Sequence, residues 1–396
     1  MVRLALDLKD EGHKVSKVIL CLPDYLYRIK GLATHTYRKP LAEFRDWLRE
    51  LAKDHEYNCF FLYNHHRPYN QIAWNLASEL GLECQVFELG LIRPNCMTVF
   101  SRDCLPLHHL KEQWQMALNR KASVPEPLPK ELQTVSTPKK MTKFAFNYVI
   151  SRLTAFLFPH FVDQREMSVR KHLKHAIIHA WRYALRSDEA RYNDLFVGEW
   201  SGKYYAVPLQ VQSDTQISHY SDYESVEAFI AEIAESFVRH APADTKLIFK
   251  IHPMDRGYGD YTDMVADLCD RLGPGRFIHL DRVHLPTMLA HARGLVTVNS
   301  SVGISALAHR RPIQVMGQAV YDLPGLTNQE GLDAFWKQAQ GPSSCNVDRF
   351  IALLLETSQG RGTLSQRCFD VPGRCRIRWP KPFQETFFGA CSAGEG

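Results

Sequence analysis

The chain has 396 residues, of which 45% are hydrophobic and 23% charged, and its formal net charge is +5. This length is too great for one ordinary core, so we expect two or three domains of a globular protein. The mild positive charge falls short of a dedicated nucleic-acid binder, and it leaves open a solvated surface, an acidic ligand or an anionic membrane surface.

Ten cysteines are scattered along the chain without a CxxC pair, which argues against a zinc ribbon or a thioredoxin-like motif. Reduced thiols in a cytoplasmic protein are the expectation. No apolar run reaches the roughly 18 residues of a membrane span, and the N-terminus lacks the apolar core of a signal peptide. We therefore expect a cytoplasmic protein that can also lie on a membrane surface.

The N-terminal half alternates between helix and strand patterns. Residues 3–12 predict the end of an amphipathic helix closed by Gly12, and residues 18–22 predict a strand. Because such a domain normally opens with a strand, we expect its first strand to be missing. Further helices are predicted over 41–53 and 70–80, and further strands over 59–63 and 84–88. This alternation predicts a parallel, Rossmann-like sheet.

The alternation breaks between residues 103 and 192, where a proline-rich linker precedes longer helical patterns. Residues 165–191 are rich in Arg, Lys and His, with Ile177, Ile178, Trp181 and Leu185 interleaved. A basic amphipathic helix of this kind can lie on anionic lipid, or it can pack between domains with a solvated basic face.

From Tyr204 the alternation resumes. Strands are predicted over 204–211, 246–251, 277–280, 294–298 and 312–315, and helices over 226–240, 261–272, 285–292 and 305–309. After about Gly341 we expect one helix, over 347–356, and an irregular end.

The fold class expected is therefore α/β and GT-B-like, with two Rossmann-like domains facing a cleft and a helical insertion between them. A first Rossmann-like domain would span residues 1–195, with the insertion at about 103–195. A second Rossmann-like domain would span 196–345, followed by a terminal helix and tail over 346–396.

Three polar turns follow predicted strands of the second domain, at the edge where open α/β sheets bind ligands. In Asn299-Ser300-Ser301-Val302-Gly303, the hydroxyls and the first N–H groups of a helix suit a nucleotide phosphate. A plain N-cap and turn explains the same residues.

The other two turns carry candidate catalytic groups. In Lys250-Ile251-His252-Pro253 the imidazole can donate to a departing phosphate, or the segment is only a strand-end turn. Asp214, set among Gln210, Gln212 and Gln216, can act as a nucleophile or base, or it can cap its own loop.

The first domain has a matching segment, Glu88 to Pro94, at the end of a predicted strand. We expect Glu88 to face the cleft, Gly90 to permit a close backbone approach or a positive φ, and Arg93 to pair with a carboxylate or phosphate. The preceding strand ends in His65-His66-Arg67, which adds positive charge. Adjacent histidines are not a metal pair at helical spacing, so no metal is expected.

Together these segments resemble the capsule polysaccharide biosynthesis proteins that are β-Kdo transferases of Gram-negative bacteria, and within them the type that starts the lipid-linked Kdo oligosaccharide. The segments are 87–94, 202–217, 250–253 and 299–307, and the resemblance runs from near Leu4 to about Ala339. The chain departs from the family pattern at its opening, which lacks a strand and a glycine-rich loop, and at Leu89, where a second acidic residue is usual.

The resemblance implies a retaining glycosyltransferase that needs no cofactor, uses CMP-Kdo as donor and takes a phosphatidylglycerol-type lipid as acceptor. It implies that Asp214 is the nucleophile, that Glu88 is the base and that His252 lies at the CMP phosphate. The other implied donor-side residues are Lys250, Gln212, Pro253, Ser300, Ser301 and Gly303. The implied acceptor-side residues are Gly90, Arg93 and Arg67.

The implied partners are the CMP-sugar, the anionic phospholipid acceptor, the inner-membrane surface and other capsule biosynthesis or export proteins, and no nucleic acid. Two alternatives stay open. One is a GT-B transferase or epimerase for another nucleotide sugar, which the same strand-end residues would serve. The other is a non-catalytic, membrane-associated capsule assembly factor.

Overall fold

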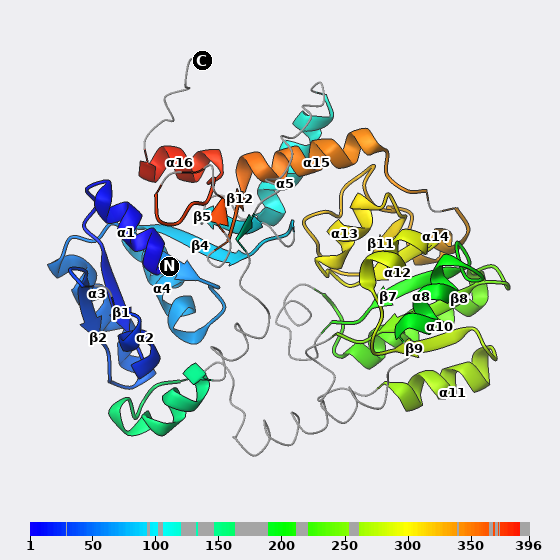
Figure 1. Cartoon of the computed structure of the whole chain (residues 1–396), viewed down its shortest axis with the longest axis horizontal. Coiled ribbons are helices and arrows are strands. Elements are labelled where there is room, and N and C mark those ends of the chain that lie inside the picture. The colour runs from blue at the N-terminus through cyan, green and yellow to red at the C-terminus, as the bar shows by residue number, and fades with distance from the viewer. Residues whose placement is uncertain are drawn as a thin grey trace. The chain divides into compact units, whose positions relative to one another are not determined.

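A computed structural model describes most of the chain, in two compact units (Figure 1). The described residues are 1–28, 30–92, 96–101, 106–119, 132–133, 146–162, 189–210, 221–252, 261–338, 340–363, 367–368, 371 and 373–388. Unit 1 comprises Met1–Pro106, Glu126–Glu166 and Ala352–Gly396. Unit 2 comprises Leu107–Pro125 and Met167–Ile351.

Unit 1 contains a four-stranded sheet in the order β12-β5-β4-β3. Its strands are β3 (Cys59–Tyr63), β4 (Glu83–Leu89), β5 (Cys96–Ser101) and β12 (Gln359–Arg361). β3 and β4 are parallel and are joined by the crossover helix α4 (Pro68–Leu80), as the alternating pattern predicts. β5 returns antiparallel to β4, because the short connection after Leu89 cannot hold the dozen or so residues of a crossover. β12 then pairs antiparallel with β5.

Helices cover both faces of this sheet. The other elements of unit 1 are α1 (Val2–Asp10), β1 (Ser16–Ile19), α2 (Leu22–Leu26), β2 (Ala33–Thr36), η1 (Leu41–Glu43), α3 (Phe44–Asp54), η3 (Ala155–Leu157) and α16 (Lys381–Phe388). β1 and β2 form a separate parallel pair. Along β4, Val86 packs with α3 and α4, whereas Phe87 packs with α1 and α16 on the opposite face. This alternation is the two-residue period of a strand buried on both faces.

The end of the chain is built into unit 1, although the sequence predicts an irregular tail there. Asp7 of α1 accepts the backbone N–H groups of Arg374 and Cys375, each at 2.7 Å. Phe383 of α16 lies on the sheet with its ring centroid 5.6 Å from that of Phe87. Apolar side chains recur at helical spacing in α16, at Phe383 and Phe387, and this is the pattern of a one-sided core helix.

Unit 2 contains a five-stranded parallel sheet in the order β11-β10-β7-β8-β9. Its strands are β7 (Tyr204–Pro208), β8 (Lys246–Lys250), β9 (Phe277–Leu280), β10 (Gly294–Thr297) and β11 (Ile313–Val315). From β7, the strands β8 and β9 are added in sequence order on one side, and β10 and β11 are then added on the other side of β7. This is the doubly wound order of a nucleotide-binding domain, and its direction reverses between β7 and β10.

Helices lie on both faces of the unit 2 sheet. They are α8 (Glu189–Val197), α10 (Val226–His240), α11 (Thr262–Leu272), α12 (Leu285–His291), α13 (Val302–Ala308) and α14 (Leu332–Gln338). Most of α5 (Pro106–Leu118) also belongs to unit 2, and its Trp114 donates to the carbonyl of Pro324 at 3.1 Å. α10, α11 and α14 pack on one face against Val207, Phe249 and Val296. On the other face, Tyr204 contacts Phe196 of α8 and donates to the carbonyl of Met288 in α12.

Three further pieces are described. Residues 146–153 form a helix of unit 1. α15 (Ser344–Thr357) begins in unit 2 and ends in unit 1, and β6 (Leu132–Gln133) pairs antiparallel with β13 (Arg367–Cys368). Most of the expected insertion over 103–195, including residues 165–188 of the predicted basic helix, lies outside the described residues. The helices that are described include none with the length and apolar character to cross a membrane.

Both units are α/β, and the parallel strands of unit 2 follow the predicted elements, so the fold class is confirmed. The domain boundaries and the facing of two domains across a cleft stay predictions.

Candidate functional site

The strand ends at the reversal point of unit 2 are tied together by two side-chain amide hydrogen bonds. Gln210, two residues past β7, donates from Nε2 to Oδ1 of Asn299 at 2.8 Å. The backbone N–H of Asn299, two residues past β10, donates to Oε1 of Gln210 at 3.1 Å. Gln210 is buried and Asn299 is half-buried, so both bonds are partly shielded from water. They fix two backbone ends at the crevice where doubly wound sheets bind ligands.

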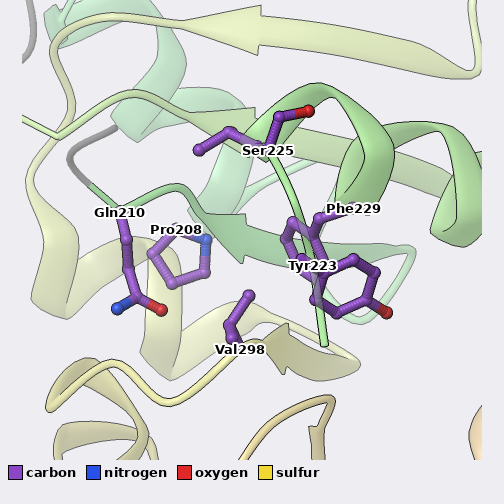
Figure 2. Close-up of a pocket in the computed structure, with 7 residues that line it drawn as sticks. Pro208, Gln210, Tyr223, Ser225, Phe229 and Val298 are labelled. Carbon is purple, nitrogen blue, oxygen red and sulfur yellow. The ribbon is translucent and has the colours of Figure 1, made fainter. Parts of the chain in front are cut away.

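A small pocket opens at these strand ends, with a volume of about 240 Å³ including the space open to solvent. Figure 2 shows Tyr223 and Phe229 to the right of Pro208, with Val298 below and the Gln210 amide to the left. The rings of Tyr223 and Phe229 meet edge to face at 5.3 Å. Burial, followed by a hydrogen bond with Glu232, raises the pKa of Tyr223, so this phenol stays neutral. The pocket therefore offers an apolar floor with an amide at its edge.

The serine turn after β10 is held by its own backbone and by one distant side chain. Ser300 accepts the N–H of Val302 at its Oγ, at 3.3 Å, and its carbonyl accepts the N–H of Gly303 at 2.9 Å. The same carbonyl accepts the hydroxyl of Tyr321 at 2.6 Å. Ser301 is the N-cap residue of α13, yet its side chain makes no capping hydrogen bond. The plain N-cap explanation thus fails for Ser301, whereas Ser300 does make a local turn contact.

Gly303 is required by the packing of Tyr321. A Cβ at this position would lie 2.2 Å from Cζ of Tyr321, which is far inside van der Waals contact. Tyr321 is fully buried, and burial raises its pKa above its ordinary value. Tyr321 therefore positions the serine turn as a neutral donor, a function that its place in the sequence does not indicate.

Lys250 and His252 lie at the end of β8, on the edge of the unit 2 sheet that also carries Gln210 and Asn299. Lys250 is the last residue of β8, is buried, and donates from Nζ to the carbonyl of Ile251 at 3.0 Å. His252 follows two residues later and is half-buried. The neighbouring strand β9 ends before Asp281, a buried carboxyl group that the motifs did not include. An acidic residue directly after an apolar strand run is the signal that could have found it.

The carboxyl edge of this sheet thus carries amides, hydroxyls, an imidazole and a carboxyl group. Asp214, Gln212 and Pro253, which the sequence also places there, lie outside the described residues. Within the described ranges, no group of three or more His, Cys, Asp or Glu side chains is arranged to hold a metal ion.

In unit 1, Glu88 lies beside the histidine turn that follows β3. Oε1 of Glu88 is 3.3 Å from Nδ1 of His65, which is close enough for an ion pair when the imidazole is protonated. The contact lacks the angles of a hydrogen bond, since Nδ1 has no hydrogen-bond partner. The turn is fixed by Asn64, whose φ is +62° and whose Oδ1 accepts the N–H of His66 at 3.0 Å. The structure therefore brings Glu88 and His65 together.

The segment after Glu88 is held by a residue from the far end of the sequence. A Cβ on Gly90 would lie 2.0 Å from the carbonyl oxygen of Cys96, so Gly90 permits a close backbone approach. The N–H of Leu91 donates to Oε1 of Gln359 in β12 at 2.9 Å, and Gln359 also donates to Thr98 at 3.0 Å. Gln359 is separated from this loop by more than 260 residues, so no local pattern could reveal the contact.

Of the two predicted acceptor-side arginines, Arg67 lies in the described part of the chain. Arg67 is exposed at the N-cap of α4, with its guanidinium 5.7 Å from the centre of the Tyr63 ring. Arg93 lies outside the described residues.

Comparison with known proteins identifies the family. Residues 58–363 match the family model described as capsule polysaccharide biosynthesis protein. The chain is 30% identical over 325 residues to the capsule polysaccharide export protein KpsS of Escherichia coli, covering 82% of this chain and 83% of KpsS. It is 30% identical over 359 residues to the capsule polysaccharide modification protein LipB of Neisseria meningitidis serogroup A, covering 87% of this chain and 84% of LipB. The chain therefore belongs to the capsule polysaccharide biosynthesis protein family, which confirms the resemblance drawn from its motifs.

Solved structures give only distant matches. The beta Kdo 2,7 transferase of Thermosulfurimonas dismutans KpsC has a TM-score of 0.43 at 14% identity, covering 88% of this chain and 92% of that one. The UDP-GlcNAc 2-epimerase of Neisseria meningitidis, bound to UDP-GlcNAc, has a TM-score of 0.28 at 11% identity, covering 89% and 88%.

Proposed function

We propose that this chain is a glycosyltransferase of capsular polysaccharide biosynthesis. It transfers Kdo from CMP-Kdo, with retention, to a phosphatidylglycerol-type lipid, and so starts a β-Kdo linker. The observation that carries the proposal is the amide pair Gln210–Asn299 at the reversal point of the unit 2 sheet, with His252 and the serine turn on the same edge. Support also comes from the family and from the names of its relatives, which refer to capsule polysaccharide export and modification.

The donor half of the reaction needs groups that stabilise a departing phosphate. When the bond from the anomeric carbon to CMP breaks, its electron pair stays on the phosphate oxygen. Hydroxyls of Ser300 and Ser301 and the imidazole of His252 are hydrogen-bond donors that suit this developing charge. Because the serine turn is already held by Tyr321, little reorganisation is required as the charge forms.

The covalent steps require two carboxylates. Asp214 attacks the anomeric carbon of Kdo as CMP leaves, giving a glycosyl-enzyme ester. The acceptor hydroxyl oxygen then attacks the same carbon, Glu88 takes its proton, and the Asp214 carboxylate is released. Two inversions give net retention, as in retaining glycosidases. Nδ1 of His65 lies 3.3 Å from Oε1 of the base Glu88.

A transfer assay tests the proposal. The protein is incubated with CMP-Kdo, generated in situ, and a fluorescent phosphatidylglycerol, and the lipid is analysed by mass spectrometry. We expect a gain of one Kdo, and its loss in Asp214→Ala. The control is Asp270→Ala, which removes an exposed carboxylate from α11 and should leave transfer unchanged. Wild-type transfer by Asp214→Ala would refute the assigned nucleophile.

The donor is tested separately by thermal unfolding. A ligand that binds only the folded protein raises the unfolding temperature by mass action. We expect CMP to stabilise the fold and UDP to have little effect. Stabilisation by UDP alone would point to another nucleotide sugar, and stabilisation by neither would favour a non-catalytic assembly factor.

A further inference from the structure

Exposed apolar side chains are concentrated on two neighbouring segments of unit 1. Of ten large apolar side chains that are exposed among the described residues, six lie in α2 or between residues 146 and 157. They are Tyr25, Leu26, Phe146, Val149, Leu153 and Phe156. Single exposed apolar residues need no explanation, whereas a contiguous group of this size marks an interaction surface.

Three of the six lie along one side of a helix, and a fourth follows in the next turn. Residues 146–153 are helical and are followed by η3. Spacings of three and four residues put Phe146, Val149 and Leu153 on the same side of the helix, and Phe156 lies in η3. Leu153 and Phe156 are 68% and 76% exposed, which is far above the level of core side chains. We call these four residues the apolar stripe.

The other side of the segment is attached to unit 1. Asn147 accepts the hydroxyl of Tyr27, the residue after α2, at 3.1 Å. Phe158 is buried, and the hydroxyl of Tyr69 donates to the carbonyl of His160 at 3.3 Å. Figure 1 shows this helix in blue-green beside α2. The apolar stripe therefore faces outward on an anchored segment, and the exposed Tyr25 and Leu26 of α2 extend the same surface.

The charges around the stripe are positive. Arg28 and Arg152 are exposed, and their guanidinium groups lie over the rings of Tyr25 and Tyr148, at 4.5 Å and 5.4 Å from the ring centres. Within residues 22–28 and 146–162 the sequence has one carboxylate, Asp24. Its Oδ2 accepts the N–H of Leu20 at 3.2 Å, so it is engaged within unit 1. In these two described segments, apolar side chains are flanked by cations and the one carboxylate is engaged within unit 1, and this combination complements a surface that is apolar inside and negative at its face.

We propose that the apolar stripe, with Tyr25 and Leu26, docks unit 1 onto an anionic lipid bilayer. The phenyl rings enter the boundary between headgroups and acyl chains, and the arginines contact the headgroup phosphates. A soluble partner would have to offer a groove lined with acidic groups, whereas an anionic bilayer presents both properties on one face. The inference goes beyond the proposed transfer reaction, because it uses none of the candidate site residues.

The test measures binding of the full chain to vesicles by co-sedimentation. The vesicles are pure phosphatidylcholine or phosphatidylcholine mixed with phosphatidylserine, which is not the acceptor class of the proposed reaction. We expect binding to the mixed vesicles, and a loss of roughly tenfold in partition coefficient for each ring removed in Phe146→Ser/Phe156→Ser. The matched control is Met116→Ser/Val197→Ser, which changes two similarly exposed side chains of unit 2 and should bind like the wild type.

A charge variant and an oligomer measurement complete the test. Arg28→Glu/Arg152→Glu should lose roughly tenfold or more of the binding that phosphatidylserine adds. The proposal would be overturned if the double Phe variant bound vesicles as well as the wild type does. It would also be overturned if the wild-type protein bound vesicles equally well with and without phosphatidylserine. If light scattering found a dimer that the Phe variant cannot form, without vesicle binding, the stripe would instead join two copies of the chain. A failed transfer assay would leave these results unaffected.

Discussion

The hydroxyl of Tyr321 can be removed without disturbing the core around it. Tyr321→Phe keeps the ring that packs against Gly303 and deletes the 2.6 Å hydrogen bond to the carbonyl of Ser300. That carbonyl still accepts the N–H of Gly303 at 2.9 Å, so it is not left without a partner. We therefore expect the free energy of unfolding to fall by only about 1 kcal/mol, the net value of one hydrogen bond.

Tyr205→Phe is the matched control. Tyr205 is also buried in unit 2, and its hydroxyl donates to the carbonyl of Trp336 at 2.6 Å. Trp336 lies in the last turn of α14, where carbonyls have no partner within the helix. Removing this donor leaves a buried acceptor unsatisfied, so we expect a larger loss of unfolding free energy, about 1–3 kcal/mol.

Ligand binding separates the two variants. Urea denaturation measures both stability changes, and thermal unfolding with and without CMP measures the affinity for the nucleotide. Tyr321→Phe loosens the serine turn, so we expect its dissociation constant for CMP to rise about fivefold, equivalent to about 1 kcal/mol. Tyr205→Phe should bind CMP like the wild type. Equal CMP affinities in the wild type and Tyr321→Phe would refute the assignment of Tyr321 as a positioning residue.

Three further predictions concern single contacts. Gly90→Ala should lower the free energy of unfolding by about 3 kcal/mol, because its Cβ would overlap the Cys96 carbonyl oxygen at 2.0 Å; an unchanged urea midpoint would contradict this. Asn299→Ala leaves the Nε2 of the buried Gln210 without its acceptor, so the free energy of unfolding should fall by about 1–3 kcal/mol. The control Gln329→Ala changes an exposed amide and should lower the free energy of unfolding by well under about 1 kcal/mol. Burial lowers the pKa of His35, so the unfolded chain binds that proton more readily and the folded protein should lose stability as pH falls below about 6.5; His35→Gln should flatten this slope in pH-dependent urea titrations.

The parallel sheet of unit 2 could be predicted because each of its strands is a short apolar run that ends in a polar turn. β8 and β10 fall within the predicted runs, and the polar residues after them lie on one edge, as the topology requires. In unit 1 the same reasoning found β3 and β4 but gave no sign of β12, whose residues Gln359 to Arg361 lack an apolar pattern. Its place is fixed by pairing with β5, which no local signal encodes.

The candidate site divides in a similar way. Glu88, His252 and Ser300 stand directly after or near the end of a strand, so position alone brings them to an edge. Tyr321 acts through a long-range hydrogen bond to Ser300, and Gln359 acts through long-range hydrogen bonds with Leu91 and Thr98. A single sequence contains no periodicity that links such pairs, so the residues that hold the two loops emerge only from the folded structure.

The contribution of the last part of the chain to unit 1 affects the order in which the protein folds during synthesis. Unit 2 ends at Ile351, so the residues of its sheet are synthesised before those of β12 and α16. Unit 1 at that stage lacks β12 and α16, and the face of its sheet that carries Phe87 and Met97 is without part of its cover. Domains normally fold from the N-terminus onward. Here the half that is synthesised first must wait for β12 and α16, and during that interval it presents an open strand edge and an apolar face on which a chaperone can act.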